Sequence, residues 1–272
     1  MRRFIRSSAK GLLLLAVVLS SYVVDLLAQD SGAPFIPGES LTYIMSYKWG
    51  AVNTDVGEAV TNLNYSNGMY HSIIKGYTYK FYDIFFRVRE HFESKFTDLP
   101  IRPSYFYRDS QESKYRMRNT FTFSSDTSKV INAIIQKHEE SPKDTLLRGS
   151  GETFDLVSLF YKVRSIDFDT ISVNIKQPIS FAIDEDVYNF YYVYAGKHVK
   201  KIKGVGTFNT LLFRVKLVAG SVFTGEQEML VWITDDKNKV PLLFESPIIV
   251  GTVYGKISKY KNLKYPLTSK IK

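Results

Sequence analysis

The sequence predicts an all-β protein built on one large curved antiparallel sheet that forms a closed or half-open barrel. Apolar and polar residues alternate repeatedly between Glu39 and Thr252, which is the period of strands with one buried face. Turn-forming residues separate these segments at short intervals, and short connections favour antiparallel neighbours. The chain also contains 19 Tyr and 19 Phe but only 2 Trp, a composition that suits a pleated, half-buried surface.

The N-terminal segment has the organisation of a cleavable secretion signal. An unbroken apolar run covers residues 12–19, and a more polar stretch leads to the small residue Ala28. The apolar run is preceded by the basic residues Arg2, Arg3, Arg6 and Lys10. Cleavage after Ala28 would leave Gln29 as the mature N-terminus.

An uncleaved membrane anchor is the alternative interpretation of this segment. A bilayer span needs about 20 mostly apolar residues, and extension of the apolar run brings in Asp25, which is costly at membrane depth. We therefore expect residues 1–28 to be removed and residues 29–272 to form a single β-rich domain in the periplasm, with no transmembrane anchor left.

Composition excludes several classes of function. The chain has no Cys, which rules out disulfides, thiolate catalysis, cysteine-based metal sites and a lipoprotein signal. The formal net charge is +9, and removal of four basic residues and Asp25 with the signal leaves the mature chain near +6. This charge favours acidic surfaces such as anionic lipid head groups. The basic residues are scattered and the chain is expected outside the cytoplasm, so we expect no nucleic acid as a partner.

The predicted strands follow the alternation along the chain. The first covers 41–47, and the clearest covers 86–96, where Phe and Val alternate with Arg, His and Lys. A third covers 210–217. Further strands are predicted at 58–65, 70–80, 103–109, 114–123, 129–138, 171–176, 187–195, 227–234 and 248–254. Turns are predicted at 66–68, 124–126, 195–197, 219–220 and 235–238.

One segment has helical spacing instead. Apolar residues at positions 156, 159, 160 and 163 predict one short helix near 153–164. Thr153 or Ser150 can cap its start, and Lys162 and Arg164 suit its C-terminal end. We expect this helix to cross the open side of the sheet. Residues 139–149 before it are predicted to be an exposed connection.

Several short motifs occur in an order that resembles a known family. They are Phe35-x-Pro37-Gly38-Glu39-x-Leu41-x-Tyr43, Val56-Gly57-Glu58-Ala59, the segment 154–164, Val231-Trp232-Ile233-Thr234-Asp235-Asp236, Lys239-Val240-Pro241 and Ile249-Val250-Gly251. In this combination the chain resembles domain-of-unknown-function family 3108, a group of exported proteins of Gram-negative bacteria, over residues 35–258. The Ala-Gln-Asp end of the signal is similar to signals of the Bacteroidetes. The resemblance implies a periplasmic β-rich fold and no catalytic residues.

Each motif also has a structural interpretation. Pro37, Gly38 and Glu39 form a turn that starts a strand, since Pro fixes φ and Gly allows the bend. Asp235 and Asp236 suit a hairpin turn. We expect Trp232 to anchor the core, and we count Pro241 with this structural group.

The basic face of the predicted strand 86–96 is the candidate ligand site. It carries Arg87, Arg89 and Lys95, with Arg116 and Arg118 expected on a neighbouring strand. One interpretation is an outer sheet face kept soluble by charge. The other is a mouth that attracts an anionic amphiphile, whose apolar tail enters an aromatic interior.

Residue types that carry catalysis or bind metals are present without a diagnostic spacing. His71, His91, His138 and His198 form no His-x-x-x-His or His-Glu-x-x-His motif. The acidic runs 184–186 and 235–236 are predicted to be solvated turns, although paired carboxylates can also serve hydrolysis or bind calcium. We therefore expect no metal and no cofactor.

The leading functional hypothesis is a non-enzymatic periplasmic protein that binds an apolar or amphipathic envelope ligand or assists envelope assembly. Export, the barrel-forming strand pattern and the aromatic content support it. One alternative is a scaffold whose outer faces bind envelope proteins. Another is a glycan or ester hydrolase that uses Asp235, Asp236 or Asp184, which requires these carboxylates to converge.

Overall fold

The computed structural model describes residues 32–125, 129–149, 151–216 and 227–272, and Pro34–Lys272 form one compact unit. The predicted signal segment and the predicted turn at 219–220 lie outside the described residues. Within them, no helix has the length and apolar character needed to cross a membrane.

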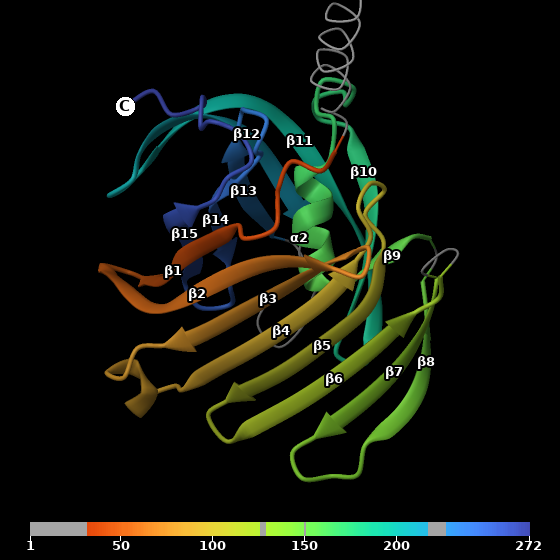
Figure 1. Cartoon of the computed structure of the whole chain (residues 1–272). Helices are drawn as coiled ribbons and strands as arrows, with labels where there is room; N and C mark the ends of the chain where they lie inside the picture. The colour runs from red at the N-terminus through yellow and green to blue at the C-terminus, as the bar shows by residue number, and fades with distance from the viewer. Residues whose placement is uncertain (1–31, 126–128, 150, 217–226) are drawn as a thin grey trace, which may run out of the picture. The chain divides into compact units, whose positions relative to one another are not determined.

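A single sheet of 15 strands makes up the compact unit (Figure 1). In space the strands follow the order β8-β7-β6-β5-β4-β3-β2-β1-β15-β14-β13-β12-β11-β10-β9. The first eight are β1 (Ser40–Trp49), β2 (Val52–Ser66), β3 (Met69–Thr78), β4 (Val88–Phe96), β5 (Pro103–Glu112), β6 (Tyr115–Phe123), β7 (Val130–Lys137) and β8 (Lys143–Arg148). The rest are β9 (Thr153–Phe154), β10 (Lys176–Ile183), β11 (Asp186–Ile202), β12 (Gly206–Lys216), β13 (Glu228–Thr234), β14 (Pro241–Pro247) and β15 (Thr252–Lys261).

The sheet is curved and open, which confirms the half-open form of the predicted barrel and not the closed one. β8 and β9 are its two edges. Neighbouring strands are antiparallel except β9 and β10, which are parallel. The turn between β10 and β11 reaches the other half of the sheet, because Asp184 pairs with Arg108 of β5 and Glu185 pairs with Lys137 of β7.

The helix α2 (Leu156–Arg164) lies within the curve of the sheet, where it contacts β4, β9 and β10 (Figure 1). The predicted helix is therefore confirmed, but the predicted cap is wrong. Asp155 is the N-cap, and its carboxylate accepts hydrogen bonds from the backbone N–H groups of Val157 and Ser158, each at 2.8 Å. Thr153 cannot serve as the cap, because it belongs to β9.

Several predicted boundaries differ from the structure. The predicted turn at 195–197 is a β-bulge inside β11. One extra residue is inserted between Tyr194 and Gly196, and the φ of +96° at Gly196 lets the strand continue. The predicted exposed connection at 139–149 contains the edge strand β8. The strand predicted at 171–176 lies before β10, which begins at Lys176. The strand predicted at 248–254 begins too early, because residues 248–251 form the turn before β15. The turn at 66–68 is confirmed, since Asn67 and Gly68 both have positive φ.

A buried ion pair joins the start of the compact unit to the end of α2. Arg164 and Glu39 are both inaccessible to solvent, and the Nη2 of Arg164 lies 2.8 Å from the Oε2 of Glu39. The guanidinium also donates to the backbone carbonyl of Asn238 through Nε and Nη2, at 3.2 and 3.1 Å. Three segments that are far apart in the sequence therefore meet at one guanidinium.

Candidate functional site

The candidate site lies on the face of β3–β6 that is turned away from α2, which we call the outer face. Ser72 of β3 and Ser94 of β4 point to the helix, since their hydroxyls contact Tyr161 and Asp155 at 3.1 and 2.8 Å. Side chains alternate along a strand, so Arg89, His91 and Lys95 of β4 lie on the other side of the sheet.

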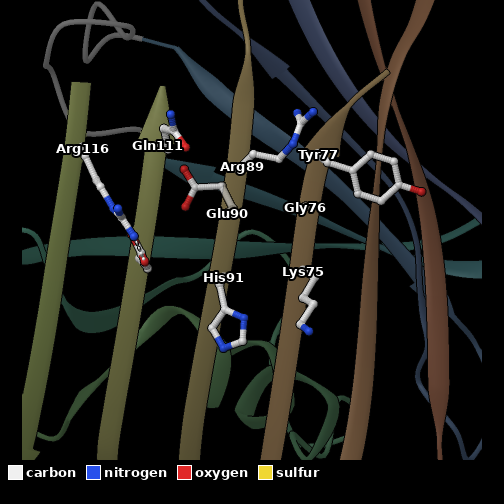
Figure 2. A pocket seen from close by; sticks show the side chains of 9 residues that line it. Lys75, Gly76, Tyr77, Arg89, Glu90, His91, Gln111 and Arg116 are labelled. Atoms are coloured by element: carbon white, nitrogen blue, oxygen red, sulfur yellow. Dashed lines mark hydrogen bonds and ion pairs between the residues drawn. The ribbon is translucent and has the colours of Figure 1, made fainter. Parts of the chain in front are cut away.

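The strand register arranges the outer face in two rows that cross four strands. One row is Tyr77, Arg89, Gln111 and Arg116, and the next row is Lys75, His91, Asp109 and Arg118. Between the rows lies a hollow of 430 Å³ (Figure 2). We call it the charged hollow, and it is lined by Lys75, Gly76, Tyr77, Arg89, Glu90, His91, Asp109, Gln111 and Arg116.

Two arginines at the hollow are fixed by carboxylates. Arg116 holds Asp109 in a two-bond contact, with Nε and Nη2 donating at 2.9 and 2.6 Å. Arg89 holds Asp83 in the same way at 3.0 and 2.6 Å. Hydrogen bonds from Arg89 and then Thr78 lower the pKa of Asp83 to about 2, and the hydrogen bond from Arg116 lowers the pKa of Asp109. Both acids therefore stay ionised at neutral pH, and both guanidiniums are oriented before any ligand arrives.

Two histidines share one carboxylate beside the hollow. The Nε2 of His91 lies 2.7 Å from Glu93, and the Nε2 of His71 lies 3.2 Å from the other oxygen of the same carboxylate. Partial burial raises the pKa of Glu93, but the hydrogen bonds from His91 and His71 outweigh it and leave the pKa below its ordinary value. Among the described residues no group of three or more His, Asp or Glu has the arrangement of a metal site.

Two polar groups of the hollow remain available for a ligand. Within the described residues, Lys75 has no ion pair or hydrogen bond, and neither does the side chain of Gln111. Lys75 is also exposed. A ligand can therefore take one ammonium and one amide at this surface without breaking an existing contact, and the oriented arginines add positive potential beside them.

The structure brings three of the five predicted cations together. Arg89 and Arg116 line the charged hollow, and Arg118 joins them through Asp109 at 3.6 Å. Lys95 lies at the other end of β4, over the ring of Tyr105. Arg87 precedes β4 and is exposed.

The cations of β4 do not form the predicted mouth, in which basic residues lie at the entrance to an aromatic interior. The cations of β4 lie on the outer face, whereas the aromatic residues Phe96 and Tyr161 are packed together on the helix side. A ligand in the charged hollow is therefore separated from that aromatic core by the sheet itself.

Sequence reasoning missed most of the lining of the hollow. Lys75, Tyr77 and Asp109 were positions of predicted strands without a functional role, and Gln111 lay between the predicted strands 103–109 and 114–123. Their alternation with apolar residues was the available signal, but only the cross-strand register shows that they meet Arg89 and Arg116.

The acidic residues considered for hydrolysis lie in two separate turns. Asp184 pairs with Arg108, and Asp235 pairs with Lys197 at 3.1 Å. The carboxylate of Asp236 accepts hydrogen bonds from the backbone of Asn238 and from Ser269, at 3.0 and 2.7 Å for the closest contacts. Each carboxylate thus has its own partner, and Asp184 lies in the β10–β11 turn, away from the β13–β14 turn that holds the other two.

The remaining motif residues have structural positions. Gly38 has φ +88° at the turn before β1, directly after Pro37, and it places Glu39 against Arg164. Trp232 is buried under the ammonium of Lys200, 3.5 Å from its ring centroid. The backbone carbonyl of Pro241 accepts a hydrogen bond of 2.9 Å from the hydroxyl of Tyr43.

Comparison with known proteins identifies the sequence pattern and the fold. The model of a family described as "Protein of unknown function (DUF3108)" matches residues 42–258. The chain matches no curated protein sequence. Its structure is similar to a crystal structure of a β-barrel-like protein of domain of unknown function DUF1849 from Brucella abortus, with a TM-score of 0.54 and 9% sequence identity over 85% of this chain and 99% of that chain. At this identity the likeness concerns the fold alone.

Proposed function

This chain belongs to the DUF3108 family, whose description assigns no function, and we propose that it is a non-enzymatic binding protein of the bacterial periplasm. Its ligand is an anionic amphipathic molecule of the cell envelope, and its binding surface is the charged hollow on the outer face. The periplasmic location rests on the secretion signal at residues 1–28.

The observation that carries this proposal is that two polar side chains of the charged hollow have no hydrogen-bond or ion-pair partner within the described residues. Lys75 and Gln111 face a hollow of 430 Å³ between two arginines that are already oriented by Asp83 and Asp109. A phosphate or carboxylate head group fits such a surface, because charge-assisted hydrogen bonds to pre-oriented donors cost little reorganisation.

An apolar surface adjoins the hollow and favours an amphipathic ligand over a simple anion. The β3–β4 connection contains the exposed residues Phe81, Ile84 and Phe85. It is tied to the hollow by the contact between Asp83 and Arg89. An acyl chain that leaves the hollow toward this end of the strands would therefore meet apolar side chains.

The non-enzymatic part of the proposal is supported by how the carboxylates are used. Asp184, Asp235 and Asp236 lie in two different connections, and each is bound by its own basic or turn-forming neighbour. Hydrolysis by paired carboxylates needs two such groups on either side of one bond.

The substitution Lys75→Gln tests the hollow with little structural cost, because Lys75 is exposed and makes no ion pair. We expect it to weaken the binding of a single-chain phosphate amphiphile, dodecyl phosphate below its micelle concentration, by about tenfold, since one charge-assisted contact is lost. Isothermal titration with residues 29–272 measures the affinity.

Lys95→Gln is the matched control, because Lys95 is an exposed lysine of the same face outside the hollow. It should leave the affinity within about twofold. Equal losses in both variants, or no binding by the unmodified chain, would contradict the proposed site. Native mass spectrometry of the protein gently extracted from periplasm gives a second measurement, in which repeated recovery without any lipid-like adduct counts against the function.

A further inference from the structure

One end of the compact unit exposes a group of large apolar side chains that the core does not use. They belong to the β3–β4 and β14–β15 connections and to the strand residues on either side of the β1–β2 connection. Their exposed fractions range from 52% to 79%. The group, which we call the apolar tip, consists of Trp49, Val52, Phe81, Ile84, Phe85, Phe86, Ile249 and Val250.

The three connections form one continuous surface. β4, β3, β2, β1, β15 and β14 are consecutive in the sheet, and all three connections lie at the same strand ends. The hydroxyl of Tyr47 donates to the carbonyl of Val250 at 2.9 Å, and Thr54 at the start of β2 is hydrogen-bonded to Tyr82. The tip is therefore held by strand ends and cross-connections, and its apolar side chains extend beyond the sheet.

Basic side chains surround this apolar group. Lys48, Lys80, Arg87 and Lys114 are exposed in the same connections or the adjoining β5–β6 turn, and that turn is joined to Arg87 by a backbone hydrogen bond of 2.6 Å from Ser113. The acids of these connections, of the β5–β6 turn and of the adjoining strand ends are Asp55, Asp83, Glu90 and Glu112. Asp83 is paired with Arg89 and Glu90 with Arg108. The tip thus combines an apolar centre with a net positive rim.

The backbone of the longest connection is suited to an apolar environment. Four N–H groups in and beside its short 3-10 helix η1 (Tyr82–Ile84) are hydrogen-bonded within the connection. Tyr82 and Asp83 donate to the carbonyl of Tyr79, and Phe85 and Phe86 donate to that of Tyr82. Unpaired backbone groups are the main cost of placing a loop at a membrane surface. This connection avoids that cost at four of its N–H groups, including those of Phe85 and Phe86.

We propose that the apolar tip docks into the surface of a lipid bilayer that contains anionic lipids. Trp and other aromatic residues favour the boundary between head groups and acyl chains, and the basic rim is attracted to anionic head groups. A second copy of the chain is a poorer occupant, because two positive rims would repel each other. The inference goes beyond the charged hollow and does not depend on it.

Trp49 is a natural reporter for this docking. It is 62% exposed, whereas the other tryptophan, Trp232, is 6% exposed. With residues 29–272, which contain the whole compact unit, we expect vesicles of phosphatidylcholine and phosphatidylglycerol to shift the tryptophan emission to the blue. Lipids brominated on the upper acyl chain should quench it. Both signals should vanish in Trp49→Phe.

Variants of the tip distinguish docking through the tip from nonspecific hydrophobic binding to vesicles. Ile84→Ser combined with Phe85→Ser should lower the vesicle-bound fraction in flotation by at least about tenfold, because two of the most exposed apolar side chains are lost. Val199→Ser is the matched control, since Val199 is 64% exposed but lies on β11 outside the tip. Lys80→Glu with Arg87→Glu should weaken binding to anionic vesicles, and added salt should do the same to the unmodified chain.

The vesicle experiments on the apolar tip and the ligand experiments on the charged hollow give results that can be told apart. Lys75→Gln should bind vesicles normally. The Ile84 and Phe85 double variant loses side chains that the acyl chain of dodecyl phosphate would meet, so its hollow is tested with methyl phosphate, which has only the head group and should bind it as it binds the unmodified chain. Absence of vesicle binding by the unmodified chain, or an equal loss in Val199→Ser, overturns the proposal. A concentration-dependent dimer in sedimentation that the double variant abolishes would assign the tip to a second copy, and that result overturns it as well.

Discussion

At the scale of single residues, the carboxylate of Asp155 is strongly affected by the fold. It is fully buried at the start of α2, and burial raises its pKa to about 6 despite hydrogen bonds from Ser158, Ser94 and Val157. The ordinary pKa of an Asp carboxyl, which we take for the unfolded chain, is 3.8. The folded state therefore holds a proton more tightly than the unfolded state between these two pH values.

This difference predicts a pH dependence of stability. The stabilising contribution of the protonated group is present below pH 3.8 and is lost as the pH rises through about 6, which lowers the free energy of unfolding by at most about 3 kcal/mol. Asp155→Asn keeps the cap and should remove this loss. Urea unfolding of both proteins between pH 4 and 7 measures it, and parallel curves for the two proteins would contradict the assigned pKa.

At the scale of secondary-structure elements, the sheet depends on close fits between neighbouring strands. Phe244 of β14 lies opposite Gly255 of β15, and a side chain at Gly255 would overlap the Phe244 ring. The aromatic ring covers the glycine, which compensates for the missing side chain and fixes the register of the two strands. The pairing of β14 with β15 therefore depends on both Phe244 and Gly255.

Gly255→Ala should therefore destabilise the protein by about 1–3 kcal/mol, because the added methyl group overpacks the pair. Combination with Phe244→Leu should recover part of the loss, and a double-mutant cycle of urea unfolding measures the coupling. Gly151→Ala is the control, since a side chain there meets no atom within 4 Å. If Gly255→Ala and Gly151→Ala are equally stable, the ring does not cover Gly255 as described.

At the scale of the whole molecule, contacts between distant segments hold the two halves of the open sheet around α2. Arg164 at the end of the helix binds Glu39 before β1 and the carbonyl of Asn238 before β14. The β10–β11 turn adds Asp184 to Arg108 of β5. These links replace the strand pairing that a closed barrel would have between β8 and β9.

Removal of one partner of the buried pair should be costly for this reason. Arg164→Met leaves Glu39 buried without its counter-charge and should destabilise the protein by about 3–5 kcal/mol. Addition of Glu39→Leu should restore part of that stability. Lys197→Met, which breaks an exposed pair with Asp235, should cost less than about 1 kcal/mol. Chemical denaturation measures all of them, and a small effect of Arg164→Met alone would show that the pair is not essential to the fold.

Sequence by itself determined the all-β class, most of the strands from β1 to β7, the helix α2 and the family. These follow from local periodicity and short motifs, because alternation along one strand reports which face is buried. It also identified Arg89 and Arg116 as part of one basic face. It failed for β8, β9 and β10, which lie at or beside an edge of the sheet, and for β14. It also failed for the bulge at Gly196, where a local irregularity hides the alternation.

Only the tertiary structure decided which residues of different strands meet. The cross-strand register brings Lys75 and Gln111 beside Arg89 and Arg116, and the sheet order joins Trp49, Phe85 and Val250 in one tip. The reason is physical. Alternation fixes which face a side chain occupies within its own strand, but a neighbour across the sheet is set by long-range pairing and turn geometry, which no local pattern encodes.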